Sequence, residues 1–195
     1  SECLVGSEMC IRDRIMKAHF GKDKTFVVGN IGNPYTLEAD KTSKDSVTVG
    51  EISSFQLETI HTFHPVVSAI LNITPDHLNR HHTMEAYVAA KEAVASQQTK
   101  ADICVLNYDN DYTRDFAGRC PATPVLFSSH QELENGYFLR GDKIIKSVNG
   151  EEHELMDIHK DMNLVGLCNV ENVMAAIAIA EGMHCLLYTS DAADE

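Results

Sequence analysis

Three short blocks of polar residues in this 195-residue chain could together bind a metal ion and a phosphate. They are Glu51-Ile-Ser-Ser-Phe-Gln-Leu-Glu58, Asn72-Ile-Thr-Pro-Asp-His-Leu-Asn-Arg80 and Ala89-Ala-Lys91. The first two blocks each follow an apolar, strand-like run, and the ends of strands in open α/β sheets are where ligands bind. A carboxylate from Glu51 and an imidazole from His77 would suit a divalent cation such as Mg²⁺, which binds few protein groups and contacts substrate phosphates.

The pattern around these blocks predicts an α/β core in which strands alternate with helices. Strands are predicted at 25–28, 46–52, 66–73, 103–106 and 125–127. The near-continuous apolar character of 66–73 is typical of a strand buried on both faces of a parallel sheet. Helices are predicted at 15–20, 55–60, 83–98 with Thr83 as N-cap, and 169–182 with Gly182 just past the end. Residues 137–139 and 143–148 predict a hairpin, to which Gly150 adds a third antiparallel strand.

The two ends of the chain are expected to come from sequencing-adapter DNA. Met9-Cys-Ile-Arg-Asp-Arg14 and Cys185-Leu-Leu-Tyr-Thr-Ser190 can be encoded by one short DNA sequence read in opposite orientations. Segments of that origin are set aside in fold reasoning. We therefore expect residues 1–14 and 185–195 to lie outside the packed domain, and residues 15–184 to form one partial domain.

Charge and cysteine content exclude several classes of protein. The formal net charge of −13 argues against nucleic acid or an anionic membrane as a partner. No apolar run approaches the roughly 20 residues of a membrane span. Between residues 15 and 184 only Cys104, Cys120 and Cys168 remain, an odd number without a CxxC pair. This usage predicts a reduced, cytoplasmic protein.

In order and spacing, the three blocks resemble the Mur ligases of peptidoglycan biosynthesis, and Ser53-Ser-Phe-Gln-Leu-Glu58 resembles their D-glutamate-adding branch. The resemblance implies the central, P-loop-type ATP-binding domain of that family: a mostly parallel sheet flanked by helices, with a small antiparallel addition. It implies an ATP-dependent ligase with Mg²⁺ that joins D-glutamate to UDP-N-acetylmuramoyl-L-alanine through an acyl phosphate. The full-length enzyme is expected to be a cytoplasmic monomer.

The same resemblance assigns the metal and catalytic residues. Glu51 and His77 are expected to hold Mg²⁺, with His77 and Lys91 in catalytic positions. Lys91 is expected to react with CO₂ to give a carbamate that helps to hold a second Mg²⁺. Because only the neutral amine reacts, the site must lower the pKa of this lysine.

Substrate and nucleotide residues also follow from the resemblance. Asn30, within Gly29-Asn-Ile-Gly32, and Ser53 are expected to bind substrate. Asn169 and Asn172 are expected to bind the nucleotide beside its adenine. The ordinary interpretations are that Asn30 supports a turn and that Ser53 or Asn169 caps a helix.

Two alternative functions stay open. The string from Asp76 through His77, His81 and His82 could bind zinc in a metal-dependent hydrolase, since histidines four apart on a helix suit that metal. A Mur ligase for another amino acid is the second alternative, because that choice is made by a domain outside this sequence. Lys91 also has an ordinary interpretation, as a solvated charge on a helix surface.

Some features of the family are missing or changed. No GxxxxGK[ST] phosphate loop occurs in the chain, although ATP chemistry needs such a cradle. By resemblance that loop precedes the helix at 15–20, so we expect this chain alone to be inactive and to bind ATP poorly. Asn79 replaces a usual Asp and Cys168 a usual His, and the second change puts the nucleotide contacts nearby in doubt.

Overall fold

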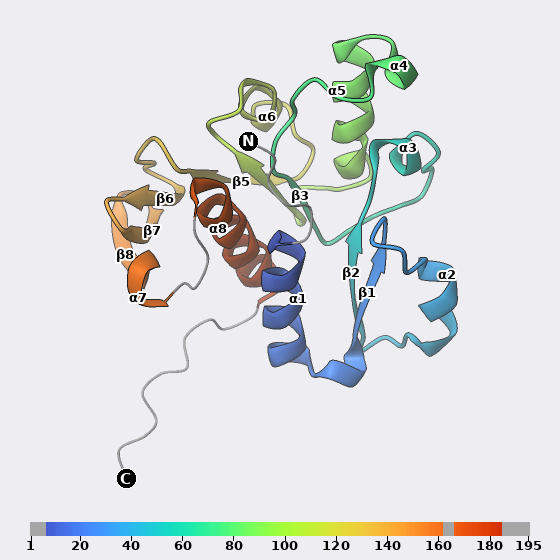
Figure 1. Cartoon of the computed structure of the whole chain (residues 1–195), viewed down its shortest axis with the longest axis horizontal. Helices are drawn as coiled ribbons and strands as arrows, with labels where there is room; N and C mark the ends of the chain where they lie inside the picture. The colour runs from blue at the N-terminus through green and yellow to red at the C-terminus, as the bar shows by residue number, and fades with distance from the viewer. Residues whose placement is uncertain (1–6, 162–165, 185–195) are drawn as a thin grey trace.

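Two β-sheets and their flanking helices make up the described part of this computed structural model, residues 7–161 and 166–184 (Figure 1). The smaller sheet pairs β1 (Thr25–Gly29) with β2 (Val47–Glu51) in parallel. The larger sheet runs in chain order through β3 (Val67–Ile70), β4 (Ile103–Asn107), β5 (Thr123–Ser128), β6 (Gly136–Arg140), β7 (Lys143–Val148) and β8 (Glu151–Asp157).

The direction of the strands confirms the predicted fold class. Strands β3 to β6 pair in parallel, and β7 and β8 continue the sheet in antiparallel fashion. The hairpin between β6 and β7 closes at Arg140↔Lys143, with Gly141 at φ +57° in its turn. The expected mostly parallel sheet with an antiparallel addition is therefore present, although its parallel strands are divided between two sheets.

The helices differ from the predictions mainly in length. They are α1 (Ser7–Phe20), α2 (Tyr35–Glu38), α3 (Ser54–Leu57), α4 (Leu78–His81), α5 (Met84–Glu92), α6 (Asp111–Ala117), α7 (Ile158–Asp161) and α8 (Leu167–Gly182), with 3-10 turns at Lys22–Lys24, Ala39–Lys41 and Ala93–Ala95. Thr83 is the N-cap of α5, as predicted, and its Oγ1 accepts a hydrogen bond from the Ala86 N–H. The α-helix ends at Glu92 and continues as a 3-10 turn, so the prediction of a helix to residue 98 was too long.

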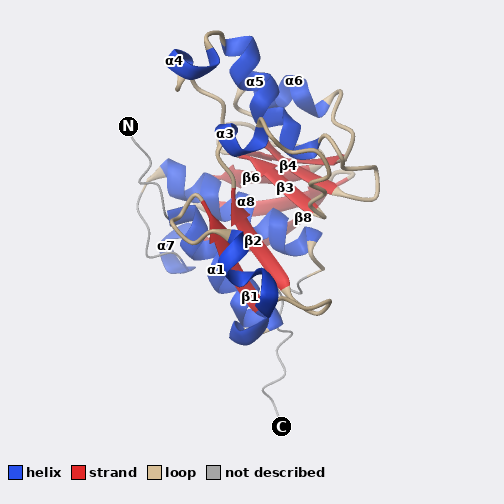
Figure 2. Cartoon of the chain, turned by 90° about the vertical axis from the view of Figure 1, so that its right-hand side faces the viewer, coloured by secondary structure: helices blue, strands red, loops and turns tan. Residues whose placement is uncertain are grey.

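Strand β4 supplies both faces of the larger sheet with apolar side chains. Cys104 and Leu106 pack in one core, together with residues of α5 and α6. Val105, between them, packs in a second core built mainly on α8. Figure 2 shows α5 and α6 on one side of this sheet and α8 on the other. Because successive side chains of a strand point to opposite faces, a strand covered on both sides must be apolar throughout.

Helix α1 joins the smaller sheet to α8. Met16, 1% exposed, packs with Val49 of β2 and Ala180 of α8, and Figure 1 shows α1 beside α8. The helix begins at Ser7, so its backbone crosses the expected domain boundary after residue 14. Residues 1–6 and 185–195 lie outside the described residues, and the expectation that both ends stay out of the packed domain remains a prediction.

The end of α8 corrects the predicted role of Gly182. Gly182 is the last residue of the helix, not the residue after it. A Cβ at this position would lie 3.1 Å from side-chain atoms of Val67 and Ile103. The glycine is therefore needed for the close approach of α8 to β3 and β4, a tertiary contact that a local capping rule does not contain.

The structure bears on two further expectations, that the cysteines are reduced and that no segment is long enough to span a membrane. Cys104 and Cys120 are free and buried, whereas Cys168 is disulfide-bonded. The expectation of reduced cysteines is therefore wrong for Cys168, because spacing along the chain does not reveal which cysteines the fold brings together. Among the described residues, no helix has both the length and the apolar character needed to cross a membrane.

Candidate active site at the strand ends

Glu51 is the last residue of β2, where the neighbouring strand β1 also ends. The Asn30 side-chain amide donates a hydrogen bond to Glu51 Oε1 at 3.0 Å, and the Asn30 backbone N–H donates to the Glu51 carbonyl at 2.8 Å. Gly29 permits this approach, because a Cβ there would lie 2.0 Å from the Glu51 carbonyl oxygen. Two residues predicted separately from the sequence, one for substrate and one for metal, thus lie in direct contact.

His77 is held in the loop after β3 by its neighbour Asp76. The Asp76 carboxylate accepts a hydrogen bond from the His77 backbone N–H at 2.7 Å, and its other oxygen lies 3.4 Å from His77 Nε2. His77 adopts left-handed backbone angles, φ 53° and ψ 25°, which place its half-exposed ring 5.0 Å from the ring of Phe55 on α3. Since α3 follows Glu51 directly, this contact brings the β3 loop to the end of β2.

Lys91 is partly buried in the last turn of α5. Burial lowers the pKa of Lys91, while the carboxylates of Asp76 and Glu51 oppose that shift. The lysine therefore lies within the electrostatic reach of both strand-end blocks. Its Nζ also lies 5.4 Å from the centre of the Tyr87 ring. The direction of this pKa shift is the one that carbamate formation needs.

The donor set fits a hard divalent cation. Glu51 supplies a carboxylate whose identified side-chain partner is the neutral amide of Asn30, so its negative charge is not cancelled by that contact. His77 supplies an imidazole oriented by Asp76. Carboxylate oxygens beside bound phosphates are the usual surroundings of Mg²⁺.

The three histidines of the hydrolase alternative do not converge. His81 is buried, with Nε2 3.0 Å from Ser54 Oγ and Nδ1 3.2 Å from a Glu58 carboxylate oxygen. Its ring stacks on Phe55 at 5.5 Å, whereas His82 is exposed. Within the described ranges, His77, His81 and His82 form no group whose ligand atoms could share a metal ion. The zinc-hydrolase interpretation therefore loses its geometric basis.

The remaining predicted residues have local roles that are compatible with binding but do not test it. Ser53 is the N-cap of α3 and forms a capping box with Gln56. Asn169 and Asn172 lie in the first two turns of α8, and Asn172 is 4% exposed. Gly166, not either asparagine, is the N-cap position of that helix. Substrate binding by Ser53 and nucleotide binding by the two asparagines stay predictions.

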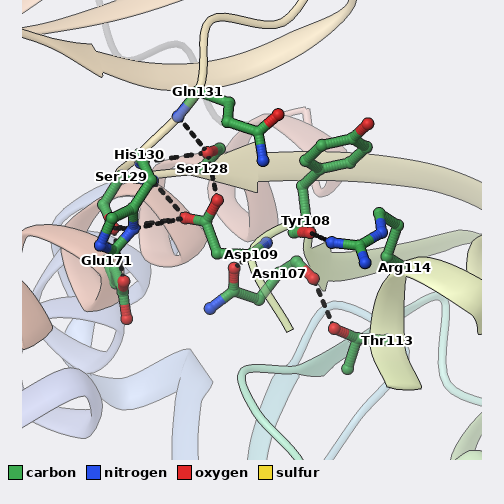
Figure 3. A network of polar contacts seen from close by, with 10 residues as sticks. All are labelled: Asn107, Tyr108, Asp109, Thr113, Arg114, Ser128, Ser129, His130, Gln131 and Glu171. Atoms are coloured by element: carbon green, nitrogen blue, oxygen red, sulfur yellow. Dashed lines mark hydrogen bonds and ion pairs between the residues drawn. The ribbon is translucent and has the colours of Figure 1, made fainter. Parts of the chain in front are cut away.

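One polar network was missed by the sequence reasoning (Figure 3). Asp109, just after β4, accepts hydrogen bonds from Ser128 Oγ at 2.6 Å and from the Ser129 backbone N–H at 2.7 Å. Burial raises the pKa of Asp109, but these hydrogen bonds and the nearby His130 outweigh burial and hold the pKa below its usual value. Glu171 of α8 joins the network through Ser129 Oγ. The rule that ligands bind at strand ends would have indicated Asp109 and His130, which follow β4 and β5 as His77 follows β3, but not Glu171 of α8.

The comparison with protein families decides the relationship. The family model for the Mur ligase middle domain matches residues 11–180. The chain belongs to the Mur ligase family. The three blocks predicted to carry the chemistry all lie within the matched range.

Relatives within this family and solved structures agree with that assignment. The chain is 57% identical over 159 residues to a UDP-N-acetylmuramoylalanine–D-glutamate ligase of Lachnospira eligens, covering 82% of the chain and 35% of the relative. It is 56% identical over 166 residues to the corresponding ligase of Lachnoclostridium phytofermentans, covering 85% and 36%. The chain thus spans about a third of the length of these curated relatives.

The fold is similar to that of Mur ligases of known structure. MurF from Acinetobacter baumannii superposes with a TM-score of 0.63 at 13% identity, over 89% of this chain and 40% of that one. MurF from Thermotoga maritima, solved in complex with ADP, gives a TM-score of 0.61 at 13% identity, over 92% and 44%. At these identities the comparison concerns the fold alone.

Proposed function

We propose that this chain is the central segment of an ATP-dependent ligase that joins D-glutamate to UDP-N-acetylmuramoyl-L-alanine in peptidoglycan biosynthesis. The observation that most supports this chemistry is the position of Lys91. Its side chain is partly buried, its pKa is lowered, and it lies in the electrostatic field of Glu51 and Asp76. The choice of D-glutamate rests on the names of relatives up to 57% identical and on the block Ser53-Ser-Phe-Gln-Leu-Glu58.

Each residue of the site has a defined task in this reaction. Asn30 fixes the Glu51 carboxylate, and Asp76 fixes the ring of His77, so that both ligands are oriented before substrate arrives. Lys91, in its neutral form, adds to CO₂ with loss of a proton and becomes a carbamate anion. Bound Mg²⁺ would neutralise charge on the phosphoryl group that passes from ATP to the substrate carboxylate, the main requirement in phosphoryl transfer.

The amine of D-glutamate then attacks the acyl phosphate and phosphate leaves. Asn169 and Asn172 are proposed to contact the nucleotide from the first turns of α8. Such an enzyme would work in the cytoplasm, where ATP is available, and we propose that it acts as a monomer.

The function is testable by grafting. Residues 15–184 would replace the matching segment of the Lachnospira eligens ligase, and release of phosphate from ATP would be measured with UDP-N-acetylmuramoyl-L-alanine and a panel of amino acids. We expect activity that depends on D-glutamate and Mg²⁺. Because the amino acid is chosen by a domain outside this chain, the graft tests the central segment, and a folded graft without ATP-dependent release of phosphate would contradict the proposed function.

Substitutions within the graft test the site itself. Glu51→Gln removes the charge of a proposed Mg²⁺ ligand and should reduce kcat roughly 10²-fold or more, as the loss of one transition-state electrostatic contact does. Glu85→Gln is the matched control, because Glu85 is an exposed acid in the first turn of α5. Equal activity of the two variants would contradict the assignment of Glu51.

A further inference from the structure

A second set of metal-type ligands converges at the edge of the larger sheet. Asp109 follows β4, His130 follows β5, and Glu171 lies in the second turn of α8. One ligand atom from each of these side chains lies within 4.8 Å of the other two. Within residues 7–161 and 166–184, no other three His, Cys, Asp or Glu residues meet this condition. Three separate segments therefore deliver an imidazole and two carboxylates to one point (Figure 3).

A single hydroxyl group lies at the centre of these ligands and cannot satisfy them all. Ser129 Oγ is 2.6 Å from Glu171 Oε1, 2.9 Å from His130 Nδ1 and 3.3 Å from Asp109 Oδ2. A serine hydroxyl has one proton to donate. Asp109 has other donors in Ser128 Oγ and the Ser129 backbone N–H, whereas Glu171 takes its hydrogen bond from Ser129 Oγ. In the described part of the chain neither carboxylate forms an ion pair with a lysine or arginine. A bound cation would neutralise the two carboxylates that converge here.

We propose that Asp109, His130 and Glu171 form a binding site for a divalent transition metal of the Zn²⁺ type. One imidazole and two carboxylates suit Zn²⁺, whereas Mg²⁺ is usually held by one or two protein groups together with water and substrate phosphates. Tetrahedral Zn²⁺ with bonds of about 2.1 Å separates its ligands by roughly 3.4 Å, so the group has to contract only modestly. His130 can make that movement, because its side chain is 61% exposed.

The site would fix the beginning of α8 to the ends of β4 and β5. Glu171 is the ligand from the helix, and Asn172 follows it directly. The hydrogen bond from Asn110 Nδ2 to the Ile73 carbonyl at 3.0 Å links the loop after β4 to the loop after β3. A metal at Asp109 would therefore stiffen the edge at which β3, β4 and β5 end.

The experiment counts bound Zn²⁺ on the 195-residue chain after treatment with a chelator. Isothermal titration calorimetry would compare the unmodified chain with His130→Ala and Glu171→Gln. We expect each variant to lose one site or to weaken it more than about 100-fold, because loss of an orienting partner alone costs 10–100-fold. Zn²⁺ should also raise the Tm of the unmodified chain more than that of either variant, and Mg²⁺ should not compete for the site.

The matched control is His153→Ala, which removes an exposed histidine of β8 with a distant Glu151 partner at 3.7 Å. It should retain the stoichiometry of the unmodified chain. Circular dichroism checks that each variant is folded, and Asp109→Asn gives a third substitution if one variant fails to fold. Equal Zn²⁺ stoichiometry in the unmodified chain and in the folded variants would overturn the proposal, as would displacement of Zn²⁺ by millimolar Mg²⁺.

Discussion

Gly29 should be far less tolerant of a side chain than Gly32, although both have positive φ. The values are +108° for Gly29 and +89° for Gly32. A Cβ at Gly29 would lie 2.0 Å from the Glu51 carbonyl oxygen, about 1 Å inside the 3.0 Å below which real Cβ contacts essentially do not occur. Around Gly32 no heavy atom lies within 4 Å of the added Cβ. Comparing an alanine substitution at Gly29 with one at Gly32 therefore separates the cost of a steric clash from the cost of backbone strain.

The expected magnitude for Gly29→Ala follows from two terms. A non-glycine residue in this backbone region costs on the order of 1–3 kcal/mol. Displacing the Glu51 carbonyl also weakens the 2.8 Å hydrogen bond that it accepts from the Asn30 N–H, at a cost of roughly 0.5–1.5 kcal/mol. We expect a loss of about 2–4 kcal/mol in the free energy of unfolding, or a fall in Tm of roughly 5–15 °C for a chain of this size.

Urea denaturation followed by circular dichroism measures this loss, provided that the m-values of the variants agree. Gly32→Ala should lose only the strain term and so remain closer to the unmodified chain. If Gly29→Ala is no less stable than Gly32→Ala, then β1 and β2 do not approach each other as described, and the placement of Glu51 beside Asn30 is wrong.

Three further predictions concern the core, a buried histidine and pH. Phe127→Ala should cost about 3–5 kcal/mol in chemical denaturation, since its side chain is fully buried between β5 and α8. His81→Ala should lower the free energy of unfolding by more than His82→Ala, because only the former loses contacts to Ser54, Glu58 and Phe55. The hydrogen bond with His64, followed by those from Thr99, lowers the pKa of Asp102 in the folded state. Between that pKa and the unfolded value the folded state binds fewer protons, so stability should fall as pH drops through this window, and Asp102→Asn should flatten the profile.

Much of the fold is readable from local patterns. Apolar runs predict the strands because β4 is buried on both faces, and Thr83 predicts the start of α5 through its side-chain cap. The predictions that failed are those that depend on tertiary contacts. Gly182 resembles a helix terminator in sequence but is a packing contact against Val67 and Ile103. The disulfide at Cys168 depends on proximity that spacing does not encode.

The candidate site was predictable where ligands follow strands directly. Glu51 and His77 were found by that rule, whereas the resemblance alone singled out Lys91. Its lowered pKa depends on burial, which the sequence of α5 does not reveal. The role of Asp76 in orienting His77 could have been inferred from their adjacency. The group of Asp109, His130 and Glu171 needed the fold, because 62 residues separate its first and last members.

Turnover of the grafted ligase with Lys91→Ala distinguishes a carbamate-forming lysine from an ordinary helix lysine. We expect kcat to fall roughly 10²–10³-fold, because the variant lacks the anion that completes the metal site. Short carboxylic acids such as formate or acetate should restore part of the activity, since they can occupy the place of the carbamate. Lys143→Ala, which removes an exposed lysine of β7, serves as the control and should leave turnover unchanged. Turnover of Lys91→Ala within about twofold of the unmodified graft, unaffected by added acid, would leave Lys91 as an ordinary helix residue and contradict the proposed site.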